Sequence, residues 1–158
     1  MAQEMFSVDH QVTLRDITEY NLIEVMKLDV APEQKKCVAP NSVSIAQGHY
    51  SKTAWFKGIY LKEQPVGFVM LDLNEEKPEY YLWRFMIDAR YQGKGYGKEA
   101  MEMIIDYVKT LPNAHELLTS CVPGEGGPEV FYKKLGFVPT GEMEDDEMVL
   151  RLVFPTEL

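Results

Sequence analysis

The sequence predicts an α/β fold of the α+β kind, a mixed, largely antiparallel twisted sheet of about seven strands flanked by about four helices. Several short segments alternate apolar and polar residues, as half-buried strands do. Others repeat apolar residues every three or four positions, as amphipathic helices do. Two pairs of strand-like segments are joined by turn residues, which favours antiparallel hairpins. A chain of 158 residues with 46% hydrophobic composition suits one core, so residues 1–158 are expected to form a single domain.

The first third of the chain predicts one strand and two helices. Residues 12–17 (VTLRDI) alternate as a strand does, and Thr18 stands where an N-cap would precede the periodic run over 20–28. After a proline-containing connection, a second short helix is expected over 41–47, capped by Asn41.

The middle of the chain predicts three strands and a long helix. Residues 55–61 and 66–73 are apolar, strand-like runs on either side of a tight turn, which is typical of a hairpin. A further strand is expected over 80–88. Residues 98–110 then carry apolar side chains at the i, i+3, i+4, i+7 spacing of one buried helix face.

The last third predicts a strand, a helix and a closing hairpin. Residues 116–122 form a short apolar run. The helix that follows begins near Glu129 and ends at Gly136, because glycine commonly terminates helices in a left-handed conformation. Strands over 137–142 and 147–154 complete the sheet as a hairpin.

The charge of the chain limits its partners. With 25 acidic and 16 basic residues, the net charge is −9 and the pI is about 4.8. This charge repels phosphate backbones and anionic lipids, so nucleic acid and membrane surfaces are not expected as partners. A cationic small molecule is favoured.

The sequence contains no sign of export or of a metal site. It has no run of about 18 apolar residues, as a spanning helix needs, and its start lacks the layout of a signal peptide. A cytoplasmic protein is expected. Cys37 and Cys121 lie far apart without C-x-x-C spacing or a histidine cluster, which predicts free thiols and no metal ligands.

Three glycines at alternate positions, Gly93, Gly95 and Gly97, follow an apolar strand and precede the long helix. Free N–H groups and the dipole at a helix N-terminus attract anions, and glycine lets a phosphate approach the backbone. A side chain at Gly95 is expected to block this approach and leave the fold intact. The phosphate-loop pattern of nucleotide hydrolases fails here, because Gln92 and Glu99 occupy two of its required positions.

Two other patterns fit the same stretch. Gly95, Gly97 and Ala100 meet the dinucleotide fingerprint G-x-G-x-x-A, but an antiparallel hairpin precedes them where that fold requires parallel strands. Gln92, Gly95 and Gly97 meet the pattern Gln/Arg-x-x-Gly-x-Gly/Ala, which wraps the pyrophosphate of coenzyme A in the GNAT family of N-acetyltransferases.

Two motifs carry the resemblance to the GNAT family. RFMIDARYQGKGYGKEAMEMI is similar to the family's cofactor motif, and VFYKKLGF is similar to its second motif; together they cover residues 80–137. Within the family, the stretch IDxRYQGKGYG, the LWRF strand and GF-x-PTGE resemble bacterial spermine/spermidine acetyltransferases. The resemblance implies the GNAT fold, acetyl-CoA as co-substrate, a primary amine as acceptor, most closely a polyamine, and a homodimer.

The resemblance also implies which residues bind acetyl-CoA. Main-chain groups of one strand meet the acetyl and pantetheine portions, and the glycine stretch meets the pyrophosphate. Glu125 stands where the family commonly has Asn, and a carboxylate only accepts hydrogen bonds. The implied residues are Phe85, Met86, Ile87, Gln92, Gly93, Lys94, Gly95, Tyr96, Gly97, Lys98 and Glu125.

The resemblance makes Tyr132 the predicted catalytic acid. A phenol with a pKa near 10 suits proton transfer to a thiolate leaving group. An ammonium acceptor must also lose a proton before it attacks, and Asp72, Glu79 and Glu142 are open as candidate bases. Trp83 occupies a place where a carboxylate is found in some relatives.

The acceptor is expected to follow acidic loops and aromatic side chains. The runs over 72–79 and 141–147 are acidic, and cation–π contacts with ring faces would suit a polycation. Trp83 and Glu142 are the predicted acceptor-binding residues. The other aromatic residues considered are Trp55, Tyr80 and Tyr81.

Two other functions stay open from the sequence. Another small amine, such as an aminoglycoside, an amino acid or a protein N-terminus, would use the same chemistry. A catalytically silent acyl-CoA sensor would keep the cofactor motif alone. The sequence does not distinguish which amine or which nitrogen reacts.

Overall fold

The computed structural model describes residues 11–124 and 126–155. In this part of the chain seven strands form one sheet in the order β1-β2-β3-β4-β5-β7-β6. The strands are β1 Val12–Arg15, β2 Ala54–Leu61, β3 Gln64–Asn74, β4 Glu79–Ile87, β5 Glu116–Cys121, β6 Val138–Glu144 and β7 Glu147–Val153. The helices are α1 Leu22–Met26, α2 Asn41–His49, α3 Tyr96–Lys109 and α4 Glu129–Lys134, with short 3-10 turns η1 Pro32–Gln34 and η2 Ala89–Tyr91. The predicted order of strands and helices is confirmed.

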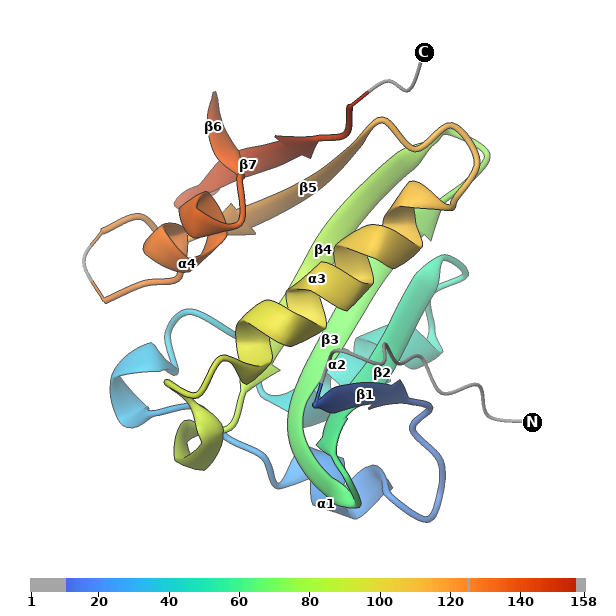
Figure 1. Cartoon of the computed structure of the whole chain (residues 1–158), viewed down its shortest axis with the longest axis vertical. Helices are drawn as coiled ribbons and strands as arrows, with labels where there is room; N and C mark the ends of the chain where they lie inside the picture. Colours follow the sequence, from blue (N-terminus) through green and yellow to red (C-terminus); the bar gives the residue numbers. More distant parts are fainter. Residues whose placement is uncertain (1–10, 125, 156–158) are drawn as a thin grey trace.

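The sheet is mixed, and its parallel pair lies at its middle. Every neighbouring pair of strands is antiparallel except β4 and β5. Figure 1 shows these two strands diverging, with β5 leading toward α4 and β4 leading toward α3. The antiparallel hairpins β2–β3 and β6–β7 confirm the two predicted hairpins.

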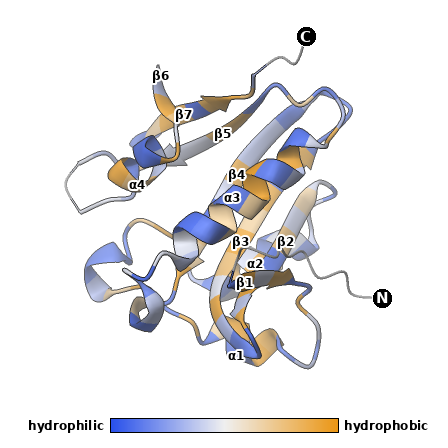
Figure 2. Cartoon of the chain, in the orientation of Figure 1, coloured by the Kyte–Doolittle hydropathy of each residue, from blue (hydrophilic) through white to orange (hydrophobic). Residues whose placement is uncertain are grey.

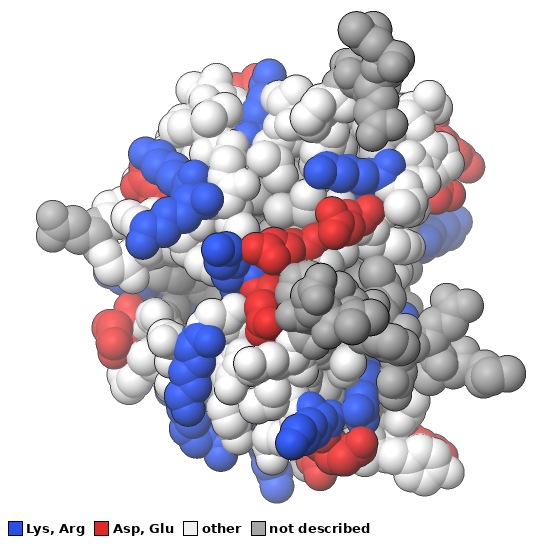
Figure 3. All heavy atoms as spheres, viewed as in Figure 1, with Lys and Arg blue, Asp and Glu red and all other residues white. Residues whose placement is uncertain are grey.

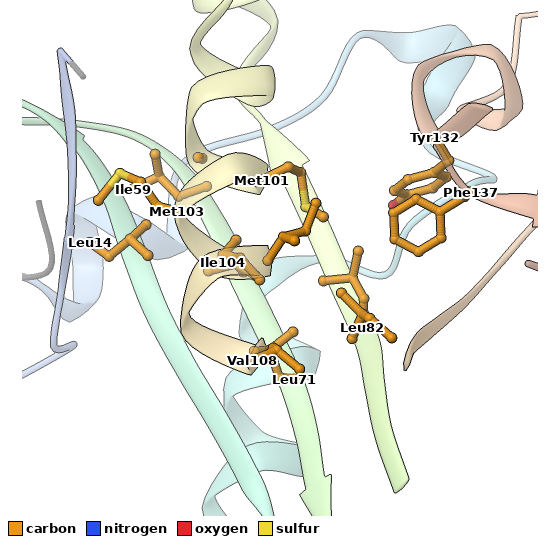
Figure 4. Packing of buried hydrophobic residues seen from close by; sticks show 14 of the residues in the cluster. Leu14, Ile59, Leu71, Leu82, Met101, Met103, Ile104, Val108, Tyr132 and Phe137 are labelled. Carbon is orange, nitrogen blue, oxygen red and sulfur yellow. The ribbon is translucent and has the colours of Figure 1, made fainter. Parts of the chain in front are cut away.

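Helices cover both faces of the sheet. Figure 1 shows α3 in front of the sheet and α1 and α2 behind it. The larger core cluster packs α3 against β1, β3 and β4, as Figure 4 shows for Met101, Ile104 and Leu82. The smaller cluster packs α1 and α2 against the opposite face. The ribbon of α3 in Figure 2 is hydrophilic and hydrophobic in turn, as an amphipathic helix requires.

Of the two predicted helix caps, the first is supported and the second is wrong. Helix α1 is assigned from Leu22, and Thr18 caps the turn that leads into it: the Thr18 hydroxyl accepts from Tyr20 N at 3.2 Å, and the Asn21 side chain accepts from Thr18 N at 2.7 Å. Helix α2 has Pro40 at its N-cap. Asn41 is buried instead, and its amide donates to Val25 O at 2.9 Å, which ties the two helices together.

The described residues contain no membrane-spanning helix, no cluster of metal-binding side chains and no disulfide. Across residues 11–124 and 126–155, no helix combines the length and the apolar character that crossing a bilayer requires. The same residues contain no group of three or more His, Cys, Asp and Glu side chains placed to hold a metal ion. Cys37 and Cys121 are free thiols, as predicted.

Candidate functional site

The site begins where strand β4 bulges and separates from β5. Met70 pairs with Arg84 and Leu71 pairs with Leu82, so Trp83 is the extra residue of a bulge. Within the described strands, β4 pairs with β5 at two positions only, the later of which is Leu82 with Thr119. Beyond this point, the edge of β4 that faces β5 carries main-chain groups without a strand partner.

A cleft of about 970 Å³ occupies the gap between the separated strands. One side is lined by β4, by the glycine stretch at residues 92–98 and by α4. The other side is lined by the segment between α1 and α2 and by the β6–β7 turn. The cleft therefore joins segments from every third of the chain.

The glycine stretch forms an open cradle at the start of α3. Gly93 and Gly95 have φ of +76° and +87°, and Gly95 is the N-cap of the helix. An added Cβ at either position would meet nothing within 4 Å, so the space beside them is open. The first turn of the helix leaves backbone N–H groups without intrahelical partners. These features fit a bound phosphate.

The backbone at Gly95 adds a cost to any substitution there. An L side chain is strained at a φ of +87°, whatever the space around it. A side chain at Gly95 is therefore expected to lower stability even where the fold stays intact, and a substitution needs a control with the same strain. Gly141, with a φ of +88° and equally open surroundings, provides one outside the cleft.

The side chain of Gln92 holds the loop rather than projecting free into the cleft. Its Nε2 donates to Ile87 O at 2.8 Å and to Gln34 Oε1 at 2.8 Å. These contacts join the end of β4, the glycine loop and η1. The loop therefore has a defined shape before any ligand is considered.

Asp88 fixes the start of the same loop through hydrogen bonds. This buried carboxylate accepts hydrogen bonds from Arg90 N at 3.0 Å, from Arg90 Nε at 2.8 Å and from Asp29 N at 3.0 Å. Burial raises its pKa, but the hydrogen bonds outweigh burial and hold the pKa of Asp88 below its usual value. The ionised side chain thus ties η2 to the segment after α1.

Tyr132 is positioned by the way helix α4 ends. Gly136 N donates to Lys133 O at 3.0 Å and Phe137 N donates to Tyr132 O at 3.1 Å, which is a Schellman motif with Gly136 at a φ of +105°. This ending turns the ring of Phe137 back onto Tyr132, with centroids 5.5 Å apart. Figure 4 shows the two rings side by side beside the core. The predicted end of the helix at Gly136 is confirmed.

The phenol of Tyr132 is buried but belongs to the lining of the cleft. Its exposed fraction is 6%. Burial raises the pKa of Tyr132 well above its usual value, against a hydrogen bond with Thr119 that lowers it. The Thr119 hydroxyl also donates to Leu82 O at 3.2 Å, at the point where β4 and β5 separate. Tyr132 is therefore a protonated donor at neutral pH.

A row of stacked rings connects β4 with α4. Phe85 stacks on Phe131 with centroids 5.7 Å apart and planes at 15°. Phe131 contacts Tyr132 edge-on at 5.5 Å. These rings line the cleft beside the missing strand pairing and give it an apolar surface there.

The part of the cleft lining at the β6–β7 turn is acidic. Glu144 and Glu147 face each other across the β6–β7 turn, and with Asp146 they line the cleft. Tyr81 donates to Glu144 Oε2 at 3.2 Å, and Ser120 donates to Glu147 Oε2 at 3.4 Å. Burial, with Glu144 nearby, raises the pKa of Tyr81 to about 12. Like charges placed opposite each other destabilise a hairpin, so this turn suits a cationic ligand.

The two predicted acceptor residues lie in different places. Trp83 lines the cleft from the bulge, and its ring centroid is 5.7 Å from the Arg84 guanidinium carbon. Glu142 is exposed and is not part of the cleft lining. Strand β6 is irregular between Pro139 and Met143, and there Glu142 N donates to the Thr140 hydroxyl. Of the acidic run 141–147, its last residues and not Glu142 reach the cleft.

The other candidate bases lie outside the cleft lining. Asp72 accepts a hydrogen bond from the Thr53 hydroxyl, and Glu79 begins β4 opposite Asn74, at the far end of the strand from the cradle. The acidic run 72–79 thus does not contribute to the lining. Glu125 lies outside the described residues.

Two of the aromatic residues considered are packing residues. Trp55 stacks on Tyr107 of α3 with centroids 5.0 Å apart. Tyr80 is buried and its hydroxyl donates to Pro112 O at 2.5 Å. Of the four aromatic residues predicted for the acceptor path, Tyr81 and Trp83 line the cleft.

The profile of the Acetyltransferase (GNAT) family matches residues 19–137, from the turn before α1 to the end of the Schellman motif. This chain belongs to the GNAT family of acetyltransferases. It is also 28% identical over 142 residues to the spermine/spermidine N(1)-acetyltransferase of Bacillus subtilis, which covers 84% of this chain and 91% of that protein. The protein is therefore an enzyme of a family that uses acetyl-CoA.

Solved GNAT-type structures share the fold. An acetyltransferase from Thermus thermophilus superposes with a TM-score of 0.74 at 13% identity, covering 96% of this chain and 100% of that one. The ribosomal-protein-S5-alanine acetyltransferase from Vibrio fischeri superposes with a TM-score of 0.66 at 16% identity, covering 97% and 96%. At such identities the likeness establishes the fold and not the acceptor.

Several residues of the GNAT cleft were not predicted from the sequence. Gln34 contacts Gln92 from 58 positions away, and no local pattern indicates that pairing. Ser120 lines the cleft because β5 separates from β4 after Thr119. Glu147 belongs to the acidic run 141–147, but the sequence of the run does not indicate which of its residues faces the cleft.

Proposed function

We propose that this GNAT enzyme transfers acetyl from acetyl-CoA to a primary amine of a polyamine such as spermine or spermidine. The observation that carries the proposal is the combination within one cleft of an open glycine cradle, a buried phenol and an acidic turn. The first two features suit the cofactor and its leaving group. The third suits a polycation.

The cofactor is assigned to the cradle side of the cleft. When bound, acetyl-CoA supplies an acetyl group activated as a thioester. The N–H groups of residues 93–98 would meet its pyrophosphate, with Lys94 and Lys98 adding positive charge. Main-chain groups of Phe85, Met86 and Ile87 on the edge of β4 that faces away from β3 would meet its acetyl and pantetheine portions, and Gln92 would keep the loop in shape. Tyr96 packs against the core beside this path.

Tyr132 is assigned as the general acid. As the amine attacks, a C–N bond forms and the C–S bond breaks, and the Tyr132 phenol gives its proton to the departing thiolate. A phenol carries its proton at neutral pH, as a general acid must. The Thr119 hydroxyl orients the phenol.

The acidic turn is assigned to the acceptor. The carboxylates in the described cleft lining are Glu144, Asp146 and Glu147. They attract ammonium groups, and through water they provide the route for the proton that the attacking nitrogen loses, because a carboxylate is too weak a base to hold it directly. Trp83 lies beside this path and offers a ring face to a cation. The Bacillus subtilis relative, a spermine/spermidine N(1)-acetyltransferase, supports this acceptor class.

The test is acetyl-CoA consumption with a panel of amines: spermine, spermidine, putrescine, lysine, an aminoglycoside and a peptide with a free N-terminus. We expect saturable turnover that is fastest with spermine or spermidine. Turnover with only the peptide or only the aminoglycoside would contradict the polyamine proposal and identify that amine as the acceptor class. Tight acetyl-CoA binding without turnover on any amine would contradict the enzymatic proposal and favour a sensor.

A further inference from the structure

The segment between α1 and α2, residues 30–40, forms one wall of the cleft and has a cavity on each side. One side faces the cleft of about 970 Å³, and the other faces a second cavity of about 210 Å³. Val30, Lys35, Val38, Ala39 and Pro40 line both cavities. Val30 and Val38 pack against the smaller core cluster. With space on both sides, the rest of the segment has few packing contacts, so its position also depends on polar contacts.

The strongest of these contacts is a pair of glutamine side chains. Gln92 Nε2 donates to Gln34 Oε1 at 2.8 Å, and Gln34 Nε2 donates back to Gln92 Oε1 at 3.2 Å. Gln34 Oε1 also accepts from Ala31 N at 3.2 Å, which holds the turn η1 together. Both glutamines are only partly exposed. The pair links the wall directly to the glycine loop.

The beginning of the wall is fixed by other means. Asp29 O accepts from Ala89 N at 2.9 Å, and Asp29 N donates to the Asp88 carboxylate at 3.0 Å. The ion pair between Lys35 and the Asp29 side chain, at 3.1 Å, is solvent-exposed and contributes little to stability. Beyond Asp29, the Gln34–Gln92 pair is thus the contact that sets how far the wall stands from the cradle.

We propose that Gln34 is a positioning residue that couples binding of the cofactor at the glycine loop to the placement of residues 30–40, the wall that shares the cleft with the acidic turn. The proposal rests on the proposed function, since it takes residues 92–98 as the cofactor cradle. A ligand that orders this loop also orders the Gln92 side chain, and through Gln34 it orders residues 30–40. Because such coupling is reciprocal, an acceptor in the cleft that favours the ordered wall tightens the cofactor by the same factor.

Amide hydrogen exchange of residues 35–39 tests the coupling without any acceptor, with coenzyme A as the probe. In the wild type we expect coenzyme A to slow exchange in this segment about two- to tenfold, the worth of one or two hydrogen bonds. In Gln34→Ala the exchange is expected to be faster and insensitive to coenzyme A. Gln64→Ala, which removes an exposed glutamine at the start of β3, is the control and should behave as the wild type.

Steady-state kinetics separates positioning from general damage. Gln34→Ala should raise the acceptor KM about two- to tenfold and leave kcat within about twofold. Gln34→Glu retains the two accepted hydrogen bonds and loses the donated one, so it should lie between Ala and the wild type. The coenzyme A dissociation constant of Gln34→Ala should no longer change when spermine is added.

Two results would overturn the coupling: coenzyme A protecting residues 35–39 equally in the wild type and in Gln34→Ala, or Gln34→Glu behaving as Ala does in both measurements. Failure of the proposed acceptor is a different result. If spermine is not acetylated but coenzyme A still protects the wall through Gln34, the coupling stands and only the acceptor class is wrong.

Discussion

The two sides of the cleft are built in opposite ways. On the α3 and α4 side, main-chain groups and buried rings surround Tyr132, whose exposed fraction is 6%. On the side of the β6–β7 turn, the lining includes the carboxylates of Glu144, Asp146 and Glu147, of which the first two are exposed. Figure 3 shows acidic and basic side chains interspersed over one face of the molecule. Around Tyr132, the first side acts over hydrogen-bond distances between buried groups. The second acts through charges that salt screens.

The largest expected effect tests the buried side. Tyr132→Phe removes the proton donor and keeps the ring, so kcat should fall about 10²-fold or more, the usual size of a general-acid contribution. Acetyl-CoA affinity should change little. Tyr80→Phe is the matched control, because it also removes a buried hydroxyl: it should lower the free energy of unfolding by about 1 kcal/mol without lowering kcat.

The pH dependence sharpens the same assignment. Because burial raises the pKa of Tyr132, its acid form persists above pH 10, the usual pKa of a phenol being about 10. The wild-type kcat/KM should rise as the amine loses its proton and show no fall below about pH 10. A Tyr132→Phe enzyme with near wild-type turnover would make Tyr132 a packing residue only.

The next largest effect tests whether the glycine cradle binds acetyl-CoA, with the cost of backbone strain controlled separately. Gly95→Ala and Gly141→Ala place the same side chain at nearly the same φ, so both should cost similar stability, on the order of 1 kcal/mol. Only Gly95→Ala should weaken acetyl-CoA binding, about tenfold or more, which is about 1.4 kcal/mol. Calorimetric titration measures the difference. Equal affinity in the two folded variants would remove the glycine loop from the site.

The smallest effect tests the exposed side. Glu147→Gln should lower kcat/KM for spermine about two- to fivefold at low salt, the size expected of exposed charges. It should also flatten the fall of kcat/KM with salt, which is expected to be steeper for spermine than for a monoamine because screening acts on each charge. Glu142→Gln is the control on the same hairpin. A larger effect of Glu142 than of Glu147 would contradict the acidic turn as the acceptor path.

The sequence by itself determined the features that depend on local backbone. Alternating glycines at the start of an amphipathic helix require a left-handed backbone and open N–H groups within a few residues, so the cradle at 93–98 was predictable. The motif around Gly136 likewise places Tyr132 against Phe137 within six residues. The hairpins and the order of the elements follow from short patterns of the same kind.

Only the tertiary structure decided which distant side chains meet. The parting of β4 from β5 opens the cleft, and an irregularity in β6 turns Glu142 away while Glu147 faces inward. Gln34 meets Gln92 because the chain folds the segment after α1 onto the end of β4. These contacts depend on strand register and on packing between elements, and a single sequence carries no local signal for either. The shape of the glycine cradle could therefore be predicted from the sequence, and the side chains gathered at the acidic turn could not.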